Sequence, residues 1–332
     1  MTEESWQKAL SFYDWQVQKT EKIQDNVYKV YGKEGEFCLK KLENPFRRNI
    51  FIFQVMKYLN QQNFSLSPAI FNAADGREYL LLEDEIWLVT IWVNGEKCCF
   101  ENPSHLKAAA NSLSLFHLAA QGLMVENQPK GYFLWQNRMA KQQKDLAFWA
   151  PKSTDQKTSF CKLYLKYWTK YYQQAQKAQN LLNLSSYQTV AKVAAAQNCF
   201  IHKDIAARNF VIDEKGKAWL IDYDYCRYDM HAVDIARLLE RALKMLDYKT
   251  EAADIILKEY CKVRKNAADE IGVATALLYF PQRFWRLAQR YFTQGSLSPE
   301  NENEYMAKLT ELLEKHEKEI SLLNYLSSFY NS

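Results

Sequence analysis

The sequence predicts an α+β fold made of two lobes: a small β-rich lobe at residues 1–93 and a helical lobe at residues 94–332. Three observations lead to this prediction. The first ~95 residues contain several short segments with the apolar alternation of strands and only one with helical spacing. After Gly95 the helical spacing dominates and is interrupted by one short hairpin. The chain has 332 residues, which is more than one ordinary domain core requires.

The first lobe is predicted to be a sheet with one helix. Residues 26–42 indicate a hairpin, because two alternating segments flank the turn sequence "GKEG". A helix is expected over 45–62, where Phe46, Ile50 and Phe53 recur at helical spacing. Strands are expected over 77–83 and 85–93, and the second is stopped by Asn94-Gly95.

The second lobe is predicted to be mostly helical. A hairpin is expected within it, because the segments "FVID" and "AWLID" are joined by the turn "EKGK". Apolar spacing and capping residues predict helices over 103–122, 154–182, 186–197, 232–247, 251–268, 270–292 and 299–326.

Composition excludes several functional classes. Apolar residues make up 48% and charged residues 25% of the chain, as in ordinary globular proteins. The net charge of +4 is spread without a basic block, so no nucleic-acid partner is expected. Seven scattered cysteines without CxxC spacing indicate reduced thiols rather than disulfides or a zinc site. No signal peptide or apolar run of ~18 residues is visible, which predicts a cytoplasmic protein with no membrane partner.

The chemistry is expected in "FIHKDIAARNFVID", residues 200–213. Here His202, Asp204 and Asn209 form the pattern H-x-D-x-x-x-x-N, and Asp222 follows thirteen residues after Asn209 at the end of the next strand. This order is the catalytic loop and metal-binding Asp of kinase-fold phosphotransferases. The predicted hairpin folds the chain back, so that Asn209 and Asp222 face the same ion.

Each residue type suits a role in ATP- and Mg²⁺-dependent phosphoryl transfer to an alcohol group. Asp204 is predicted to be catalytic, because its carboxylate can orient the attacking hydroxyl and accept its proton. Asn209 and Asp222 are predicted to bind Mg²⁺, which prefers oxygen ligands. His202 is expected to hold the loop through hydrogen bonds rather than to transfer protons.

Two further segments are predicted to bind the ATP cofactor. Lys40 in "FCLKKL" matches the strand lysine that contacts the phosphates, and Lys41 should point to the other face of the strand. The segment "LVTIWVNG" is predicted to be the hinge between the lobes. The backbone of Thr90, Ile91 and Trp92 is expected to meet the adenine edge.

Over nearly its whole length the chain resembles the bacterial spore-coat-associated, kinase-like proteins of the CotS type. The segments that carry the resemblance are "VYKVYGKEGEFCLKKL", "SLSLFHLAAQGL", "SSYQTVAKVAAAQNCFIHKDIAARNFVID" and "WLIDYDYCRYDMHAVDIARLL", the last with Asp234-Ile235 on a helix. The resemblance implies a protein-kinase-like fold of the aminoglycoside phosphotransferase and choline kinase type, a small-molecule acceptor, and the same roles for Lys40, Asp204, Asn209 and Asp222. It also implies other spore-coat proteins as partners and deposition on the spore coat.

Alternatives remain open at this stage. "HKDIAARN" also resembles the tyrosine-kinase loop, but neither D-F-G nor A-P-E follows, which favours a small-molecule kinase. No G-x-G-x-x-G precedes the hairpin; "QKTEKIQDN" stands in the place of a phosphate-covering loop. The helix 46–62 has no Glu to pair with Lys40, and Gln54 could offer only a hydrogen bond. The second hypothesis is therefore a catalytically weak or inactive structural component of the spore coat.

Two features outside the catalytic motif also carry predictions. An acidic or aromatic acceptor pocket for a cationic or polyhydroxylated molecule is predicted from Asp224, Asp229 and Asp234 with the neighbouring tyrosines 223, 225 and 228. The apolar stripe of residues 299–326, which starts after the favourable N-cap Ser298, is expected to pack on its own domain. A docking helix for partner proteins is the alternative.

Overall fold

The computed structural model describes residues 4–155, 158–293 and 299–330. By internal contacts the chain divides into two compact units. Unit 1 comprises residues 1–129 and 198–228, and unit 2 comprises residues 130–197 and 229–332. The mixture of a sheet and helices confirms the predicted α+β class. The predicted lobe boundary at residue 93 falls inside unit 1 and stays a prediction.

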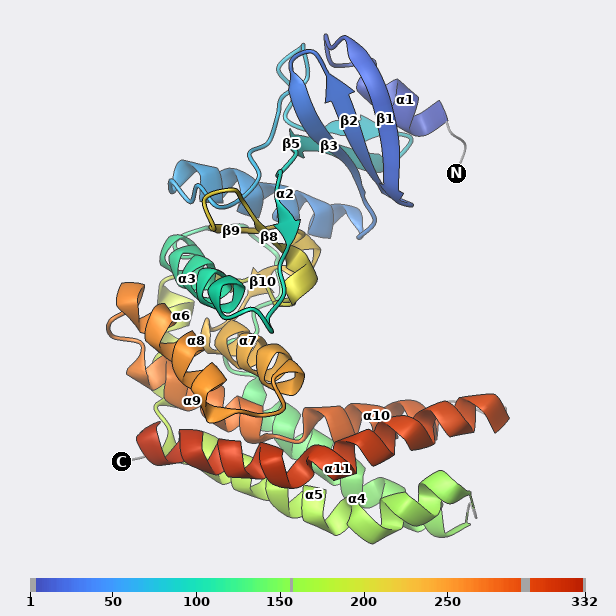
Figure 1. Ribbon diagram of the computed structural model, residues 1–332, viewed down its shortest axis with the longest axis vertical. Helices are drawn as coiled ribbons and strands as arrows, with labels where there is room; N and C mark the ends of the chain where they lie inside the picture. Colours follow the sequence, from blue (N-terminus) through green and yellow to red (C-terminus); the bar gives the residue numbers. More distant parts are fainter. Residues whose placement is uncertain (1–3, 156–157, 294–298, 331–332) are drawn as a thin grey trace. The chain divides into compact units, whose positions relative to one another are not determined.

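Unit 1 is built around a five-stranded antiparallel sheet with the strand order β1-β2-β3-β5-β4 (Figure 1). Its strands are β1 (Val17–Gln24), β2 (Val27–Gly32), β3 (Gly35–Leu42), β4 (Leu80–Leu82) and β5 (Glu85–Ile91). Alternate residues of β2 and β3 are buried, as the alternating sequence predicts. This core also takes residues from the short helix α1 (Glu4–Leu10). The predicted helix after the hairpin is α2 (Phe46–Gln61).

Strand β1 is a feature that the sequence analysis missed. The segment "QKTEKIQDN" was expected to replace a phosphate-covering loop, but most of it is paired with β2. Nearly every side chain of β1 is exposed, because the strand lies at the edge of the sheet. Without a buried face it lacks the apolar alternation by which strands are recognised in a sequence.

The remaining part of unit 1 positions the catalytic motif. Helix α3 (Pro103–Ala119) starts as predicted, with Asn102 Oδ1 accepting a hydrogen bond from the Ser104 amide. The predicted hairpin consists of β8 (Phe210–Ile212) and β9 (Ala218–Leu220), with β6 (Glu96–Lys97) on its outer edge. Strands β7 (Phe200–Ile201) and β10 (Arg227–Tyr228) form a second short pair. Two 3₁₀ turns, η1 (Ala207–Asn209) and η2 (Tyr223–Tyr225), follow the catalytic loop and Asp222.

Unit 2 consists of helices in the described part of the chain. They are α4 (Trp135–Asp155), α5 (Ser159–Leu184), α6 (Tyr187–Ala196), α7 (Ala232–Met245), α8 (Thr250–Val263), α9 (Ala268–Tyr279), α10 (Gln282–Thr293) and α11 (Pro299–Tyr330). Two predictions were wrong here. The helix expected over 154–182 begins only at Ser159, and the separate helix α4 precedes it. The helix expected over 270–292 is two helices, because Pro281 cannot donate the hydrogen bond that would continue α9.

The C-terminal stripe packs inside unit 2. Leu309, Leu312 and Leu323 on α11 are at most 5% exposed, and α11 lies against α5, α9 and α10 (Figure 1). This confirms the predicted intramolecular packing rather than a docking helix. The predicted N-cap, Ser298, lies outside the described residues. Within the described ranges, no helix combines the length and the apolar character that crossing a bilayer requires.

Candidate active site

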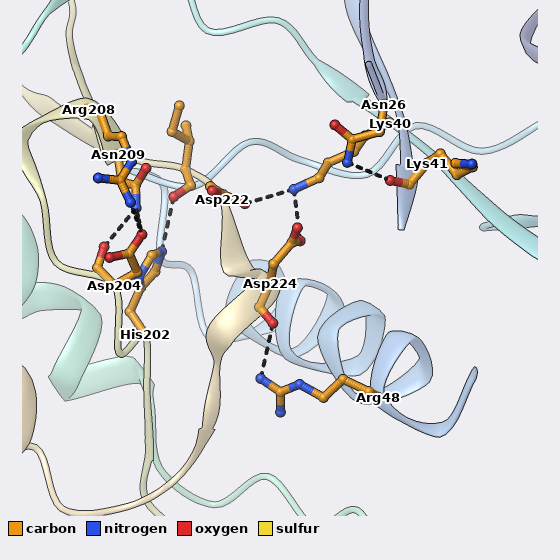
Figure 2. A network of polar contacts seen from close by, with 11 residues as sticks. Asn26, Lys40, Lys41, Arg48, His202, Asp204, Arg208, Asn209, Asp222 and Asp224 are labelled. Carbon is orange, nitrogen blue, oxygen red and sulfur yellow. Dashed lines mark hydrogen bonds and ion pairs between the residues drawn. The ribbon is translucent and has the colours of Figure 1, made fainter. Parts of the chain in front are cut away.

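The predicted catalytic loop is tied to the strand end that carries Asp222. His202 is fully buried, and its Nε2 donates a hydrogen bond of 3.0 Å to the Ile221 carbonyl. The Ile221 amide donates to the Asn209 carbonyl at 2.9 Å. The residue just before Asp222 is thus held from both ends of the loop (Figure 2). This geometry agrees with the predicted loop-holding role of His202.

The backbone at two positions of this site is in the left-handed region. Lys203 has φ of 71° and Asp222 has φ of 68°. Non-glycine residues adopt this conformation at a cost of about 1–3 kcal/mol, and it persists only where the surroundings impose it. The bonds from His202 and Asn209 to Ile221 provide such a constraint on Asp222.

Asp204 and Asn209 are directly bonded to each other. Asn209 Nδ2 donates to Asp204 Oδ2 at 3.0 Å and to the Asp204 carbonyl at 2.7 Å. Arg208 also donates to Asp204 Oδ2, at 2.5 Å. The side chains of Arg208 and Asn209 thus share the Oδ2 oxygen of Asp204. Among the described residues, no side chain bonds to its other oxygen, Oδ1. Because the Asn209 nitrogen faces Asp204, its oxygen is left for another partner, such as a metal ion.

Lys40 connects the sheet to the metal-binding end of the motif. Its Nζ lies 2.8 Å from Asp222 Oδ1 and 2.8 Å from Asp224 Oδ1 (Figure 2). Lys41 pairs instead with Glu85 at 2.9 Å, on the other face of the strand as predicted. The structure therefore brings Lys40 to Asp222, and Asp204 to Asn209, within unit 1.

The charges in this cluster shift one another's pKa values. Burial by itself lowers the pKa of Lys40, but the carboxylates of Asp224 and Asp222 outweigh it and raise that pKa above its ordinary value. Burial raises the pKa of Asp222, but Lys40 outweighs it and holds that pKa below its ordinary value. For Asp224, burial and the nearby charge of Asp222 outweigh Lys40, so its pKa is raised.

The sequence analysis missed two residues that complete this cluster. The missing Glu of α2 is replaced by Asp224, and Lys40 bonds to Asp224 rather than to Gln54. Helix α2 contributes Arg48 instead, whose Nη2 donates to the Asp224 carbonyl at 3.2 Å (Figure 2). Asp224 is the second acid of the segment "IDYD", which could have indicated a partner for Lys40. The sequence analysis instead predicts Asp224 in the acceptor pocket.

The other acids predicted for an acceptor pocket are not on a surface. Asp229 and Asp234 are both fully buried in unit 2. Asp229 accepts hydrogen bonds from the Trp135 indole at 3.2 Å and from the Met230 amide at 3.0 Å. The prediction that Asp224, Asp229 and Asp234 line an acidic acceptor pocket is therefore wrong, since Asp224 bonds to Lys40 and the other two are fully buried.

The three predicted hinge residues are at the end of β5. Two of their amides are already used, because Ile91 donates to the Ala69 carbonyl at 3.0 Å and Trp92 to the Glu36 carbonyl at 2.9 Å. Thr90 is buried, and its hydroxyl donates to the Ile91 carbonyl at 3.2 Å. A base could therefore use carbonyl groups here, but not the amides of Ile91 and Trp92.

A groove of about 740 Å³ lies beside this segment in unit 1. It is lined by residues 91–96, residues 212–215 and Trp219. Gly95 is required there, because a Cβ at this position would lie 2.1 Å from the Ile212 carbonyl oxygen. The groove is within the usual size range of small-molecule sites. Ile91 and Trp92 line it, whereas Thr90 does not.

The chain alone could supply only part of a metal site. Among the described residues, no group of three or more His, Cys, Asp or Glu side chains is placed to hold an ion. Asn209 and Asp222 would therefore contribute some oxygen ligands, and phosphates and water the others, as is usual for Mg²⁺. The ammonium of Lys40 shows that the Asp222 carboxylate accommodates a cation.

Comparison with known proteins agrees with this geometry. Residues 19–270, about three quarters of the chain, match the model of the phosphotransferase enzyme family. The chain belongs to this family. The match spans Lys40, the catalytic loop and Asp222.

Solved structures share the fold of this phosphotransferase. An aminoglycoside phosphotransferase from Alicyclobacillus acidocaldarius has a TM-score of 0.86 at 20% identity, with 98% of this chain and 96% of that chain covered. An amicoumacin kinase in complex with AMP-PNP, Ca²⁺ and Ami has a TM-score of 0.60 at 15% identity, covering 95% and 92%. A microcompartment-associated aminopropanol kinase has 0.60 at 16%, covering 97% of both chains. The protein-kinase-like fold of the aminoglycoside phosphotransferase type is thereby confirmed.

Proposed function

We propose that this phosphotransferase is an ATP- and Mg²⁺-dependent kinase that phosphorylates a hydroxyl group of a small hydroxylated or amino compound. The observation that carries the proposal is the contact of Lys40 with Asp222 and Asp224, at the end of a strand whose Ile221 amide bonds to the Asn209 carbonyl. A cation and two carboxylates meet here, and such groups are what phosphates and a metal ion require.

Asn209 and Asp222 would hold the metal, with Asp224 beside them. When bound, Mg²⁺ would neutralise charge on the phosphates of ATP. Lys40 would then exchange a carboxylate contact for a phosphate oxygen. Its raised pKa keeps it protonated at neutral pH, which suits this role.

Asp204 would position the acceptor. Its Oδ2 is fixed by Arg208 and Asn209, so that the other oxygen can accept the proton of a substrate hydroxyl. In the transfer, the acceptor oxygen bonds to the γ-phosphorus, the bond from that phosphorus to the bridging oxygen breaks, and ADP leaves. The side chain contributes mainly by orientation.

The adenine would lie beside the hinge, where Ile91 and Trp92, which line the groove, would present carbonyl oxygens to its amino group. The amide donor would come from the following residue, Val93, since the amides of Ile91 and Trp92 are used within the chain. The AMP-PNP bound to the related amicoumacin kinase supports a nucleotide cofactor.

The class of acceptor is suggested by the relatives. They are named as an aminoglycoside phosphotransferase, an amicoumacin kinase and an aminopropanol kinase, which supports a small-molecule acceptor rather than a protein. Association with the spore coat and with other coat proteins rests on the sequence resemblance alone. The structural-component hypothesis rested on the missing Glu partner of Lys40 and on the missing glycine-rich loop. The pairing of Lys40 with Asp224 answers the first point and supports the enzyme.

The test is calorimetric titration of the full chain with ATP, with and without Mg²⁺, followed by ADP-release assays on aminoglycosides, amino alcohols and polyols. Asp222→Asn should abolish Mg²⁺-dependent ATP binding. Absence of ATP binding at millimolar nucleotide by the folded wild type would rule out the proposal. ADP release that persists in Asp204→Asn would instead show that the assigned catalytic residue is wrong.

A further inference from the structure

Unit 2 contains a cavity whose lining includes none of the residues assigned to the kinase site. It has a volume of about 50 Å³, opens to solvent, and lies among residues of α4, α5, α7, α9, α10 and α11. One water molecule needs ~10–15 Å³ by this kind of measure, so there is room for a ligand of a few non-hydrogen atoms. Its apolar wall includes Trp135, Val233, Leu277, Phe280, Phe284 and Leu312.

A buried hydroxyl and a half-buried carboxyl at this cavity have no hydrogen-bond partner among the described residues. Tyr171 is 2% exposed, and its hydroxyl makes no hydrogen bond. The charges that act most strongly on this hydroxyl are those of Glu319 and Arg283, which both line the cavity. The Glu319 carboxyl takes part in no hydrogen bond or ion pair within the described residues. Burial raises the pKa of Glu319 to about 7. An unpaired buried hydroxyl is costly, so Tyr171 and the carboxyl of Glu319 offer two contacts to a polar molecule bound in the cavity.

The cavity also offers cationic donors. Arg237 pairs with Glu240 at 2.6 Å, and Arg283 donates to the Tyr248 hydroxyl at 2.9 Å. A guanidinium has five N–H groups, so each arginine keeps donors for a ligand. The lining thus has two arginines, 237 and 283, and two glutamates, 240 and 319. Its charges balance, which disfavours a polycation and suits a ligand with one charge of each sign.

We propose that this cavity binds a small zwitterion that carries an ammonium and a carboxylate group, as a short amino acid does. Glu319 receives the ammonium, Arg237 and Arg283 receive the carboxylate, and the Tyr171 hydroxyl bonds to a polar atom of the ligand. All the residues involved belong to unit 2, whereas the residues of the proposed ATP site belong to unit 1.

The test uses three probes on the full chain without nucleotide: L-serine, ethanolamine, which lacks the carboxylate, and L-lactate, which lacks the ammonium. L-serine should bind at least about tenfold more tightly than either analogue, the effect of losing one charge-assisted contact. Glu319→Gln and Tyr171→Phe, which keep side-chain size, should each weaken L-serine by about tenfold. Glu314→Gln, at an exposed position of the same helix, is the matched control and should bind normally.

Calorimetry also provides a readout that a merely structural role of Glu319 would not change. The ammonium ionises Glu319, whose charged neighbours are Arg237, Glu240 and Arg283, so L-serine binding near neutral pH should release protons. The heat should then depend on the buffer in wild type but not in Glu319→Gln. The proposal is overturned if no probe binds the folded protein, if an analogue binds equally well, or if both variants bind like wild type. Mg²⁺-ATP titration of the same variants tests the kinase site separately.

Discussion

Lys40 Nζ lies 2.8 Å from Asp224 Oδ1, although the two residues are 184 positions apart in the chain. The same ammonium lies 2.8 Å from Asp222 Oδ1. The strand lysine is thus oriented by the turn after β9 and not by an acid on α2. Because one cation contacts two carboxylates, the arrangement resembles the contacts that a metal ion bound at Asp222 would make.

Replacing Lys40 should weaken nucleotide binding. In Lys40→Met the phosphates lose a cation, and Asp222 and Asp224 are left to repel them. The Kd for Mg²⁺-ATP should rise at least about tenfold, as expected for the loss of a charged contact. Lys41→Met is the matched control, since Lys41 pairs with Glu85 on the other face of the strand. Equal losses in the two variants, measured by calorimetry, would contradict the role of Lys40.

Asp222 and Asp204 should differ in the step that they affect. Asp222→Asn removes a charge from the metal ligand and should abolish Mg²⁺-dependent ATP binding. Asp204→Asn should leave that binding within about threefold of wild type but lower phosphoryl transfer by about a hundredfold or more. Calorimetry gives the first quantity and ADP release the second. If both variants lose ATP binding equally while they stay folded, the role assignment is wrong.

Arg48 is expected to support the site through the backbone of Asp224. Arg48→Gln removes the donor to the Asp224 carbonyl and frees the turn that carries both carboxylates. The affinity for Mg²⁺-ATP should fall by about three- to tenfold, less than for the loss of a direct charged contact, because Arg48 acts only through the backbone of Asp224. The neighbouring Arg47 is exposed, and Arg47→Gln should bind like wild type. An unchanged affinity in Arg48→Gln would contradict the supporting role.

Local sequence patterns predicted much of the site. The pattern from His202 to Asn209 and the turn "EKGK" are short-range features, so the loop, the β8–β9 hairpin and the position of Asp222 followed from them. The opposite faces of Lys40 and Lys41 followed from the alternation of a strand.

What the sequence did not predict depends on long-range packing. No periodicity links Lys40 to Asp224 or Arg48 to its carbonyl, because these contacts form only once α2 lies next to η2. Strand β1 was missed because its edge position leaves it without a buried face. Helix α4 contains Pro151 in its last turns, which masks the helical pattern at its end.

The pH dependence of Mg²⁺-ATP binding should report on Asp224. Burial and Asp222 raise its pKa against the opposing charge of Lys40. Since a metal prefers the ionised carboxylate, affinity should fall on acidification, starting at a higher pH than for an ordinary aspartate. Asp224→Asn should bind Mg²⁺-ATP more weakly near neutral pH and should not show this fall in affinity. The protonation of ATP itself affects both proteins equally. A wild-type profile parallel to that of Asp224→Asn would contradict the prediction.

Two groups on α11 should affect stability with opposite signs as the pH falls. Burial lowers the pKa of His316 from 6.5 to about 4, so between these values the unfolded chain binds more protons and the free energy of unfolding decreases on acidification. Burial raises the pKa of Glu319 from 4.5 to about 7, so the folded chain binds more protons in that window and the free energy of unfolding increases. Each effect is at most about 3 kcal/mol and is reduced by solvent screening.

Urea unfolding of the full chain, followed by circular dichroism at about pH 7 and about pH 5, separates the two contributions. His316→Leu removes a group that must be protonated on unfolding, so its loss of stability between the two pH values should be smaller than in wild type. Glu319→Gln removes a group that releases a proton on unfolding. The Glu319→Gln variant should therefore lose more stability than wild type between the two pH values. Glu314→Gln, exposed on the same helix, should follow wild type. If the pH-dependent loss of stability differs from wild type in the same direction in His316→Leu and Glu319→Gln, the pKa shift of at least one of the two groups is wrong.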